Sequence, residues 1–433
     1  MTPKGAVGVG LLGCGVVGGA AARILMENRA DLAQRAGTPI ELRRVAVRSR
    51  DKKRAVELPR EHWTTDPWVV VRDPRIDVVV EVMGGIQPAR DLIIEATKCG
   101  KHVVTANKEL LATEGKEVMD AADRAAVDLL FEASVGGGIP IIRPMKESLS
   151  GDRVSRVMGI VNGTTNFILT RMSESGLSFG QALEEAQRLG YTELDPSADI
   201  EGFDAAAKLA ILASLAFNAR VLASDVERQG ISGVTARDIS EARTLGYTLK
   251  LLAVAERWGD EVSARVHPAM VPETHPLAAV RDVFNAVFVE AQEVGELMFL
   301  GRGAGGPPTG SAVVGDIVEI ARNLTNGARS WGCTCYRDRA RILAREKTMS
   351  RYYVVLSVAD QPGVLSAVAG AFAKHGVSIA SVRQEGFGDE ATLVLVTHSA
   401  TEGRHQATWR DLAAIPSVKR VASRVRVLGT EEG

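Results

Sequence analysis

The chain has 433 residues, of which 45% are hydrophobic and 24% are charged. These proportions are ordinary for a folded protein and exclude an intrinsically disordered chain. Lys and Arg residues (52) nearly balance Asp and Glu residues (53), so the sequence lacks the positive excess of most nucleic-acid-binding proteins. At about 150 residues per domain, this length allows two or three domains.

The sequence also argues against export and against a membrane location. Beyond the N-terminus, no apolar run reaches the roughly 18 residues that a membrane helix needs. The uncharged stretch 5–22 superficially resembles a signal peptide, but it contains five glycines between Gly8 and Gly18, a poor composition for an apolar helix. We therefore expect a cytoplasmic protein with no membrane partner and no nucleic-acid partner.

The N-terminal segment predicts a nucleotide-binding βαβ unit. A G-x-G-x-x-G motif stands between a predicted strand at 6–12 and a predicted helix at 20–34, and a second strand follows at 40–47. The motif residues are Gly13, Gly15, Val16, Val17 and Gly18. The first glycine permits a tight turn, the second lets a pyrophosphate approach the backbone, and the third lets the helix pack closely on the sheet. The alternative is a glycine-rich turn with a purely structural role.

The loop after the second strand bears on the choice of cofactor. An NAD-specific site usually has an acidic residue there, which binds the ribose hydroxyls. This chain instead has Arg48, Ser49 and Arg50, and two cations with a hydroxyl suit a 2′-phosphate. We therefore expect NADP(H) to be preferred, with NAD(H) possible. The alternative is a solvated run of charges that leaves the preference open.

Strands and helices continue to alternate through residues 1–134, which predicts an α/β domain of Rossmann type with a doubly wound parallel sheet. Ligands of such sheets bind beyond the carboxyl ends of the strands. Three further segments follow predicted strands in this way: Gly84, Thr105 to Lys108, and Ser134 to Gly138. We expect these segments at the same edge of the sheet as the glycine motif.

The pattern changes after residue 134 and predicts two further domains. Residues 135–330 are typical of an α+β catalytic and dimerisation domain, in which 300–330 return to the nucleotide domain. Residues 331–351 are expected to form a linker, because Arg and Lys are frequent there and apolar residues show little periodicity. Residues 352–428 have the order βαββαβ, which is typical of a ferredoxin-like domain.

The most informative helix is predicted at 204–217. Asp204 and Lys208 lie one turn apart on it and share its apolar face, where a charged residue without a role is uncommon. A buried ammonium group suits a general acid, so Lys208 is a candidate catalytic residue. The alternative is an ordinary salt bridge near the start of a helix.

A loop broken by Gly and Pro precedes this helix and carries four acidic residues. They are Glu193, Asp195, Asp199 and Glu201. Together these carboxylates could bind an ammonium group of a substrate. The alternative is a polar surface loop.

The four cysteines are too few for a disulfide scaffold in a chain of this length. Cys14 lies in the glycine motif and Cys99 in a predicted helix, and neither is placed as a thioester-forming nucleophile. This placement argues against an acylating aldehyde dehydrogenase. Cys333 and Cys335 lie on the linker, where a redox switch is one alternative.

Taken together, the motifs resemble homoserine dehydrogenase, and they follow one another in order along nearly the whole chain. They are Gly13-Cys-Gly15, Thr105-Ala-Asn-Lys108, Phe131 to Pro140, Asn162-Gly-Thr-Thr-Asn166, Gly190-Tyr-Thr-Glu193, Gly202-Phe-Asp204 with Lys208, and Gly303 to Ala312. The C-terminal segment 357–365, Ser-Val-Ala-Asp-Gln-Pro-Gly-Val-Leu, resembles the start of an ACT domain.

This resemblance implies the reversible, NAD(P)-dependent reduction of L-aspartate 4-semialdehyde to L-homoserine. The residues that it places at the site are Lys208 as proton donor, Glu193, Asp204 and Lys108 at the substrate, and Thr105, Lys108, Gly190 and Gly305 at the cofactor. It also implies a structural monovalent cation, Na⁺ or K⁺, because all-oxygen ligands suit a hard cation. The residues that match the cation site are Glu132 and, through their carbonyls, Val135, Gly137 and Ile139.

The ACT-like domain implies regulation and assembly. We expect L-threonine as a feedback inhibitor, bound where the turn Asp360 to Gly363 meets the start of the next helix, with the linker transmitting the effect. Such domains pair across chains, so a homodimer or homotetramer is expected. The alternative is that this domain only dimerises the chain.

Two other functions stay open at this point. The first is a different semialdehyde or amino-acid oxidoreductase on the same framework, which a panel of substrates would separate. The second is a non-catalytic nucleotide-sensing protein whose C-terminal domain receives an effector. Such a sensor would not need Lys208 on an apolar helix face.

Overall fold

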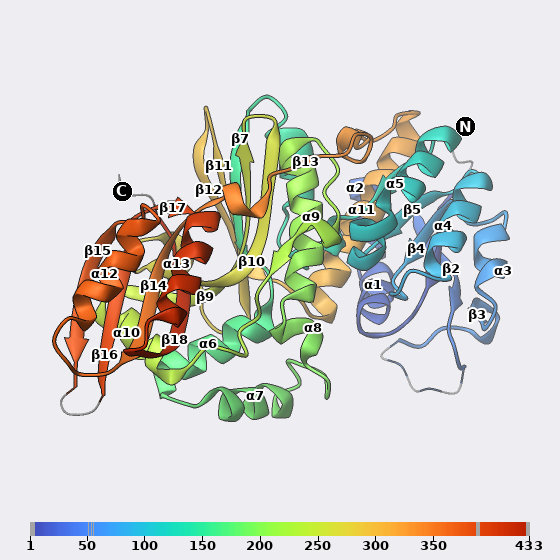
Figure 1. Cartoon of the computed structure of the whole chain (residues 1–433). Coiled ribbons are helices and arrows are strands. Elements are labelled where there is room, and N and C mark those ends of the chain that lie inside the picture. Colours follow the sequence, from blue (N-terminus) through green and yellow to red (C-terminus); the bar gives the residue numbers. More distant parts are fainter. Residues whose placement is uncertain (1–4, 51, 53, 55, 387–389, 430–433) are drawn as a thin grey trace.

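The computed structural model describes residues 5–50, 52, 54, 56–386 and 390–429. A six-stranded sheet forms the N-terminal domain (Figure 1). In the order in which they are hydrogen-bonded, its strands are β3 (Trp63–Thr64), β2 (Ile40–Ala46), β1 (Val7–Leu12), β4 (Val78–Glu81), β5 (His102–Thr105) and β6 (Leu129–Leu130). Every pairing is parallel, and the order is that of a doubly wound nucleotide-binding sheet. This topology confirms the predicted Rossmann-type fold.

The helices around this sheet come from distant parts of the chain. They are α1 (Val16–Glu27), α2 (Arg29–Ala36), α3 (Pro67–Arg72), α4 (Ala89–Lys98), α5 (Lys108–Ala125) and α11 (Gly306–Asn326). Glycine lets α11 lie against α1, because a Cβ at Gly310 would come within 2.8 Å of the Cβ of Ala20. The prediction of a single helix at 20–34 is wrong. Asn28 leaves the helical conformation, with φ −104° and ψ 23°, and separates α1 from α2.

The second sheet runs through both of the remaining domains. Along its hydrogen-bonded path its strands are β12 (Gly295–Arg302), β11 (Phe284–Ala291), β7 (Val154–Ile160), β9 (Tyr247–Trp258), β10 (Glu261–Pro272), β18 (Val418–Val427), β14 (Met349–Val358), β16 (Ala391–Thr397) and β15 (Ile379–Glu385). The short strands β8 (Glu227–Arg228) and β13 (Arg341–Ile342) pair with β10, and β17 (Ala400–Thr401) pairs with β14.

β10 and β18 join the central and C-terminal domains into one sheet. Ala269 and Met270 pair with Arg426 and Val427 in parallel register. The C-terminal domain is therefore attached by backbone hydrogen bonds as well as by the connecting chain. Nothing in the local sequence pattern predicted this contact.

The central domain packs its helices on the second sheet. They are α6 (Gly163–Ser175), α7 (Phe179–Arg188), α8 (Ser197–Ile200), α9 (Phe203–Phe217) and α10 (Ala236–Thr244). In α9 every residue from 205 to 215 is buried, and the helix contacts β7, β9 and β10. Because Lys208 belongs to this buried run, its ammonium group must find its partners inside the protein.

The C-terminal domain has the predicted order βαββαβ, with α12 (Val364–Lys374) and α13 (Glu402–Ala414) between its strands. Its sheet order, β18-β14-β16-β15, is the ferredoxin-like arrangement, so this expectation is confirmed. Within the described ranges, no helix is long and apolar enough to cross a membrane.

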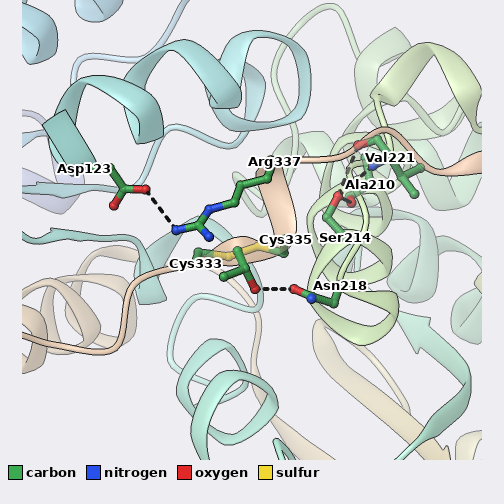
Figure 2. Close-up of a disulfide and its surroundings, with 9 residues drawn as sticks. Asp123, Ala210, Ser214, Asn218, Val221, Cys333, Cys335 and Arg337 are labelled. Carbon is green, nitrogen blue, oxygen red and sulfur yellow. Dashed lines mark hydrogen bonds and ion pairs between the residues drawn. A yellow bond between two sulfur atoms is a disulfide. The ribbon is translucent and has the colours of Figure 1, made fainter.

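The segment 331–351, which the sequence marks as a linker, lies packed against the rest of the protein. Cys333 and Cys335 form a disulfide (Figure 2), and the side chains of Cys335 and Tyr336 are buried. The Tyr336 ring fills space that a Cβ at Gly115 of α5 would need, because the two would be only 2.4 Å apart. The buried side chains of Cys335 and Tyr336 thus help to anchor a segment that has little apolar periodicity.

This connector touches the C-terminal ends of two helices. Thr334 donates a hydrogen bond of 2.6 Å to the side-chain oxygen of Asn218, just after α9, and Arg337 lies 3.8 Å from Asp123 of α5 (Figure 2). The N-terminal ends of the same two helices carry Lys108 and Lys208. The connector therefore braces the pair of helices that hold the candidate catalytic residues.

Candidate active site

The glycine motif forms a tight turn at the predicted position, and this turn leaves no room for side chains at Gly13 and Gly18. A Cβ at Gly13, whose φ is +101°, would lie 2.9 Å from the carbonyl oxygen of Val82. A Cβ at Gly18 would lie 2.3 Å from the carbonyl oxygen of Gly13. Gly15, in contrast, faces open space and caps α1 without a side-chain hydrogen bond, so the first N–H groups of α1 stay free for an anion. Val16, the first residue of α1, is 75% exposed.

The start of α11 lies beside the start of α1. A Cβ at Gly306 would lie 3.0 Å from the carbonyl oxygen of Val16, and Gly305 caps α11 with a φ of +113°. Pro307 and Pro308 follow and carry no N–H, so α11 brings backbone close to the glycine motif but offers few donors there. Gly305 is thus placed beside the predicted phosphate site.

The loop that bears on cofactor choice ends β2 at the same edge of the sheet. The side chains of Arg48 and Arg50 are exposed and form no ion pair with any described residue. Arg54 donates a hydrogen bond of 2.7 Å to the carbonyl oxygen of Lys52 and another to that of Ser49, which holds the loop backbone. Two exposed cations on the loop after β2, without an ion pair among the described residues, fit a 2′-phosphate.

The ends of β4 and β5 are tied together by a buried carboxylate. Glu81 is fully buried; it accepts hydrogen bonds of 2.7 Å from the Thr105 hydroxyl and 2.8 Å from the N–H of Met83. Asn107 donates to the carbonyl oxygen of Gly85 at 2.6 Å. Glu81 was not predicted as a site residue, although an acidic residue at the end of a buried apolar strand is a signal for one.

Lys208 and Asp204 form the centre of the candidate active site. The Lys208 ammonium donates to Oδ2 of Asp204 at 2.8 Å and to the carbonyl oxygen of Val161 at 2.7 Å. The Nζ of Lys108, at the start of α5, lies 3.4 Å from Oδ1 of Asp204. Because α5 belongs to the nucleotide domain and α9 to the central domain, the site lies where the two domains meet (Figure 1).

The charges around Asp204 favour its ionised form. Burial alone would raise the pKa of the Asp204 carboxyl. The ammonium groups of Lys208 and Lys108, with hydrogen bonds from Lys208 and Asn162, outweigh burial and hold this pKa below its ordinary value. The Asp204 carboxylate is in turn the ion-pair partner of the buried Lys208 ammonium group.

The acidic loop before α9 is connected to this centre through a single side chain. Nδ2 of Asn162 lies 2.7 Å from Oδ1 of Asp199 and 2.9 Å from Oδ2 of Asp204. Thr192 donates to the other oxygen of Asp199 at 3.1 Å. Glu193, the next residue, is exposed, and its side chain has no hydrogen bond or ion pair with a described residue.

The structure thus brings only part of the predicted substrate set into contact. Lys108, Asp204 and Lys208 meet directly, whereas Glu193 and Gly190 lie on the neighbouring loop. Asn162 belongs to one of the motifs that carry the family resemblance, but no role was predicted for it. The feature that could have indicated a role is a polar residue between a buried strand and the start of a helix.

The Glu132 carboxylate, matched to a cation site, is held by the backbone. Its two oxygens accept hydrogen bonds of 2.7, 2.9 and 2.9 Å from the N–H groups of three consecutive residues that start at Ile141. Within the described ranges, no group of three or more His, Cys, Asp or Glu side chains could hold a metal. Val135, Gly137 and Ile139 are buried in the adjacent loop, so only main-chain carbonyls there fit a cation.

Comparisons with known proteins agree over almost the whole chain. Residues 13–132 match the NAD-binding domain of homoserine dehydrogenase, 140–318 match homoserine dehydrogenase, and 352–414 match the ACT domain. The chain is 47% identical to homoserine dehydrogenase of Corynebacterium glutamicum, across 98% of this chain and 96% of that protein. It is 51% identical to homoserine dehydrogenase of Mycobacterium tuberculosis, across 98% of each.

Solved structures show the same relationship. A homoserine dehydrogenase from Thiobacillus denitrificans has a TM-score of 0.93 and 40% identity, and the match covers 98% of each chain. A hyperthermophilic archaeal homoserine dehydrogenase in complex with NADPH has a TM-score of 0.62 and 29% identity, across 73% of this chain and 97% of that one. With the parallel nucleotide-binding sheet, the Asp204–Lys208 centre and the ferredoxin-like C-terminal domain, these matches show that the chain belongs to the homoserine dehydrogenase family and ends in an ACT domain.

Proposed function

We propose that the protein catalyses the reversible, NAD(P)-dependent reduction of L-aspartate 4-semialdehyde to L-homoserine. The observation that carries this proposal is the contact of Lys208, Asp204 and Lys108 at the junction of the nucleotide and central domains. The curated relatives named homoserine dehydrogenase support it over their full length. Residues 1–134 would bind the cofactor, and the central domain would bind the substrate.

The proposed mechanism uses Lys208 as the proton donor. The nicotinamide, when bound, supplies the hydride for the aldehyde carbon. An ammonium group has three N–H donors, and Lys208 uses two of them on Asp204 and Val161, which leaves one for the substrate oxygen. As negative charge builds on that oxygen, Lys208 stabilises it and transfers the proton.

Asp204, Glu193 and Lys108 would bind and orient the substrate. Asp204 holds the Lys208 ammonium group in place and offers its carboxylate to the substrate ammonium group, with exposed Glu193 as a second carboxylate nearby in the chain. Lys108 adjoins both the Thr105 segment at the cofactor edge and the Asp204 carboxylate, so it would lie between cofactor and substrate.

Oxidation of L-homoserine, followed by nicotinamide absorbance, tests the proposed reaction. A panel of other amino-alcohols and semialdehydes separates it from a related oxidoreductase. Cofactor binding without turnover of any of these substrates would instead favour a nucleotide-sensing protein.

For the cofactor we propose a preference for NADP(H), with NAD(H) accepted less well. The support is the pair of exposed arginines, Arg48 and Arg50, after β2, where an NAD-specific site usually has an acidic residue. The archaeal relative was solved with NADPH. Michaelis constants for the two cofactors test the preference, and a tenfold preference for NADH would contradict it.

For regulation we propose L-threonine as a feedback inhibitor that binds the ACT domain, which in this family suggests an amino-acid effector. Gly363 caps α12 with a φ of +87° and no side-chain hydrogen bond. The N–H of Val364 donates to the carbonyl oxygen of Gln361 at 3.5 Å, which leaves the N–H groups of Leu365 and Ser366, without a partner among the described residues, for a carboxylate. The inhibitory effect has two routes to the central domain: the packed connector and the paired strands β10 and β18.

We further propose a homodimer or homotetramer, and a monovalent cation held by main-chain carbonyls. The family resemblance supports both. For the cation, the ligands would be Glu132 and the carbonyls of Val135, Gly137 and Ile139, and three backbone N–H groups fix the Glu132 carboxylate. Melting temperatures in K⁺, Na⁺ and choline chloride at equal ionic strength test the cation, and equal values would contradict it.

A further inference from the structure

We propose that Asn162 is a positioning residue of the active site, whose side-chain amide fixes the carboxyl groups of Asp199 and Asp204 relative to each other. This inference rests on the proposed roles of Asp204 and Lys208. It assigns to Asn162 a task that reaches the reaction only through other residues.

The orientation of the Asn162 amide follows from its partners. Asn162 is 5% exposed and lies between β7 and α6. Its Oδ1 accepts hydrogen bonds of 2.9 Å from both the N–H and the hydroxyl of Thr165, and in this way Asn162 caps α6. With the oxygen fixed on α6, both N–H groups of Nδ2 are directed to the carboxylates of Asp199, at 2.7 Å, and Asp204, at 2.9 Å.

The arrangement brings two like charges together. Two carboxylate oxygens that share one nitrogen partner lie close together, and like charges at such a separation repel each other. A neutral donor with two N–H groups can satisfy both carboxylates without adding charge. Lys208 donates to the same oxygen of Asp204 as Asn162, Oδ2, and also to the carbonyl oxygen of Val161, the residue next to Asn162.

The dipeptide Val161–Asn162 therefore holds both members of the proposed acid–base pair. The Val161 carbonyl oxygen fixes the Lys208 ammonium, and the Asn162 amide fixes the Asp204 carboxylate. Through Asp199 and Thr192, the same amide connects the pair to the loop that carries Glu193. The loop and the pair would thus keep a constant relative position when substrate binds.

Substitutions at Asn162 can separate this role from helix capping. Asn, Asp and Ser are about equally good N-cap residues, so Asn162→Asp and Asn162→Ser both keep an acceptor for the start of α6. Neither variant keeps two N–H donors for the acids. Ser178→Asp, at the capped start of α7 away from the site, is the matched control for a cap substitution.

The experiment measures kcat and kcat/KM of the full-length enzyme from pH 6 to pH 9, with melting temperature and NADPH binding as folding controls. We expect both variants to lose at least about tenfold in kcat at pH 8. The kcat ratios of the two variants to the wild type should diverge as the pH falls. The loss in Asn162→Ser should stay constant over this range, because the ammonium groups of Lys208 and Lys108 still hold the pKa of Asp204 below its ordinary value. Asn162→Asp should recover, because a protonated Asp at this position restores both a donor and the original charge.

Wild-type kcat in both variants would overturn the proposal, and so would a loss in Asn162→Asp that does not shrink as the pH falls. If Asn162→Asp does not fold, the loss of kcat in Asn162→Ser, at unchanged melting temperature and NADPH binding, decides alone. Lys208→Ala keeps the two proposals apart. Near-normal turnover of Lys208→Ala removes the proposed mechanism itself, whereas an inactive Lys208→Ala with unchanged Asn162 variants removes only the role of Asn162.

Discussion

The ammonium nitrogen of Lys208 lies 2.8 Å from Oδ2 of Asp204, one turn earlier on the most deeply buried helix of the central domain. Exposed pairs with this spacing contribute little, but the side chains of this one are only 11% and 13% exposed. A buried cation of this kind is retained where its charge is used, and the proposed proton transfer uses it.

Replacement of Lys208 by Ala should lower kcat at least about a hundredfold while cofactor affinity changes little, because the proton donor is lost but the nucleotide domain is untouched. Steady-state kinetics and NADPH binding by fluorescence measure the two effects. Lys116→Ala is the matched control. Lys116 also pairs with an acid one turn away, at 2.8 Å, but the side chains of this pair are more than a third exposed, at 38% and 35%. Near-normal turnover of Lys208→Ala would remove this residue from the mechanism.

The stability of the protein should depend on pH through Asp316. Burial raises the pKa of this carboxyl to about 7, although Arg143, whose Nη2 lies 2.6 Å from Oδ1, opposes the shift. A carboxyl with a raised pKa stabilises the fold fully below its unfolded pKa, near 4, and this stabilisation is lost as the pH rises through about 7.

Asp316→Asn should abolish that dependence, because the amide does not titrate. Between pH 5 and pH 8, the wild type should lose at least about 2 °C more in melting temperature than Asp316→Asn. Glu319→Gln is the control, since Glu319 pairs with the same arginine at 2.5 Å but is more exposed. Equal changes in melting temperature for the wild type and Asp316→Asn across this pH range would contradict the assignment.

Thiol counting tests the connector. The sequence has four cysteines, of which Cys14 and Cys99 are free and Cys333 and Cys335 are bonded to each other. Protein purified without reductant and then unfolded should therefore show two reactive thiols per chain, and four after reduction. Four thiols before reduction would show that the connector carries a dithiol.

Regulation by L-threonine should depend on the start of α12. Gly363→Ala places a methyl group beside the free N–H groups and should raise the threonine concentration for half-inhibition at least about tenfold, with kcat unchanged. Gly376→Ala is a matched control, because Gly376 has a similar left-handed conformation, with φ +63°, at the other end of the helix. Equal effects of the two substitutions would show that α12 is only strained, and unchanged inhibition in both would move the effector site elsewhere.

Local sequence patterns predicted the elements whose cause is local. The strand, the glycine motif and the second strand of the nucleotide unit depend on neighbouring residues, and so do the spacing of Asp204 and Lys208 and the order of the C-terminal domain. The break at Asn28 was missed because one polar residue between two good helices leaves little trace in the pattern.

Contacts between distant segments could not be predicted from the same patterns. The pairing of Ala269 with Arg426 joins two strands that each look complete by themselves. The bridge from Asn162 to Asp199 and Asp204 depends on three separate elements meeting at one point. The hydrogen bonds that fix the Glu132 carboxylate also come from residues nine to eleven positions later in the chain, which no local pattern indicates.

The most direct test of the account is the oxidation of L-homoserine by the purified full-length protein, followed by nicotinamide absorbance with NADP⁺ and with NAD⁺. We expect turnover that requires L-homoserine, is faster at low concentrations of NADP⁺ than of NAD⁺, and disappears in Lys208→Ala. A wild-type protein that binds NADPH but does not oxidise L-homoserine with either cofactor would contradict the proposed function.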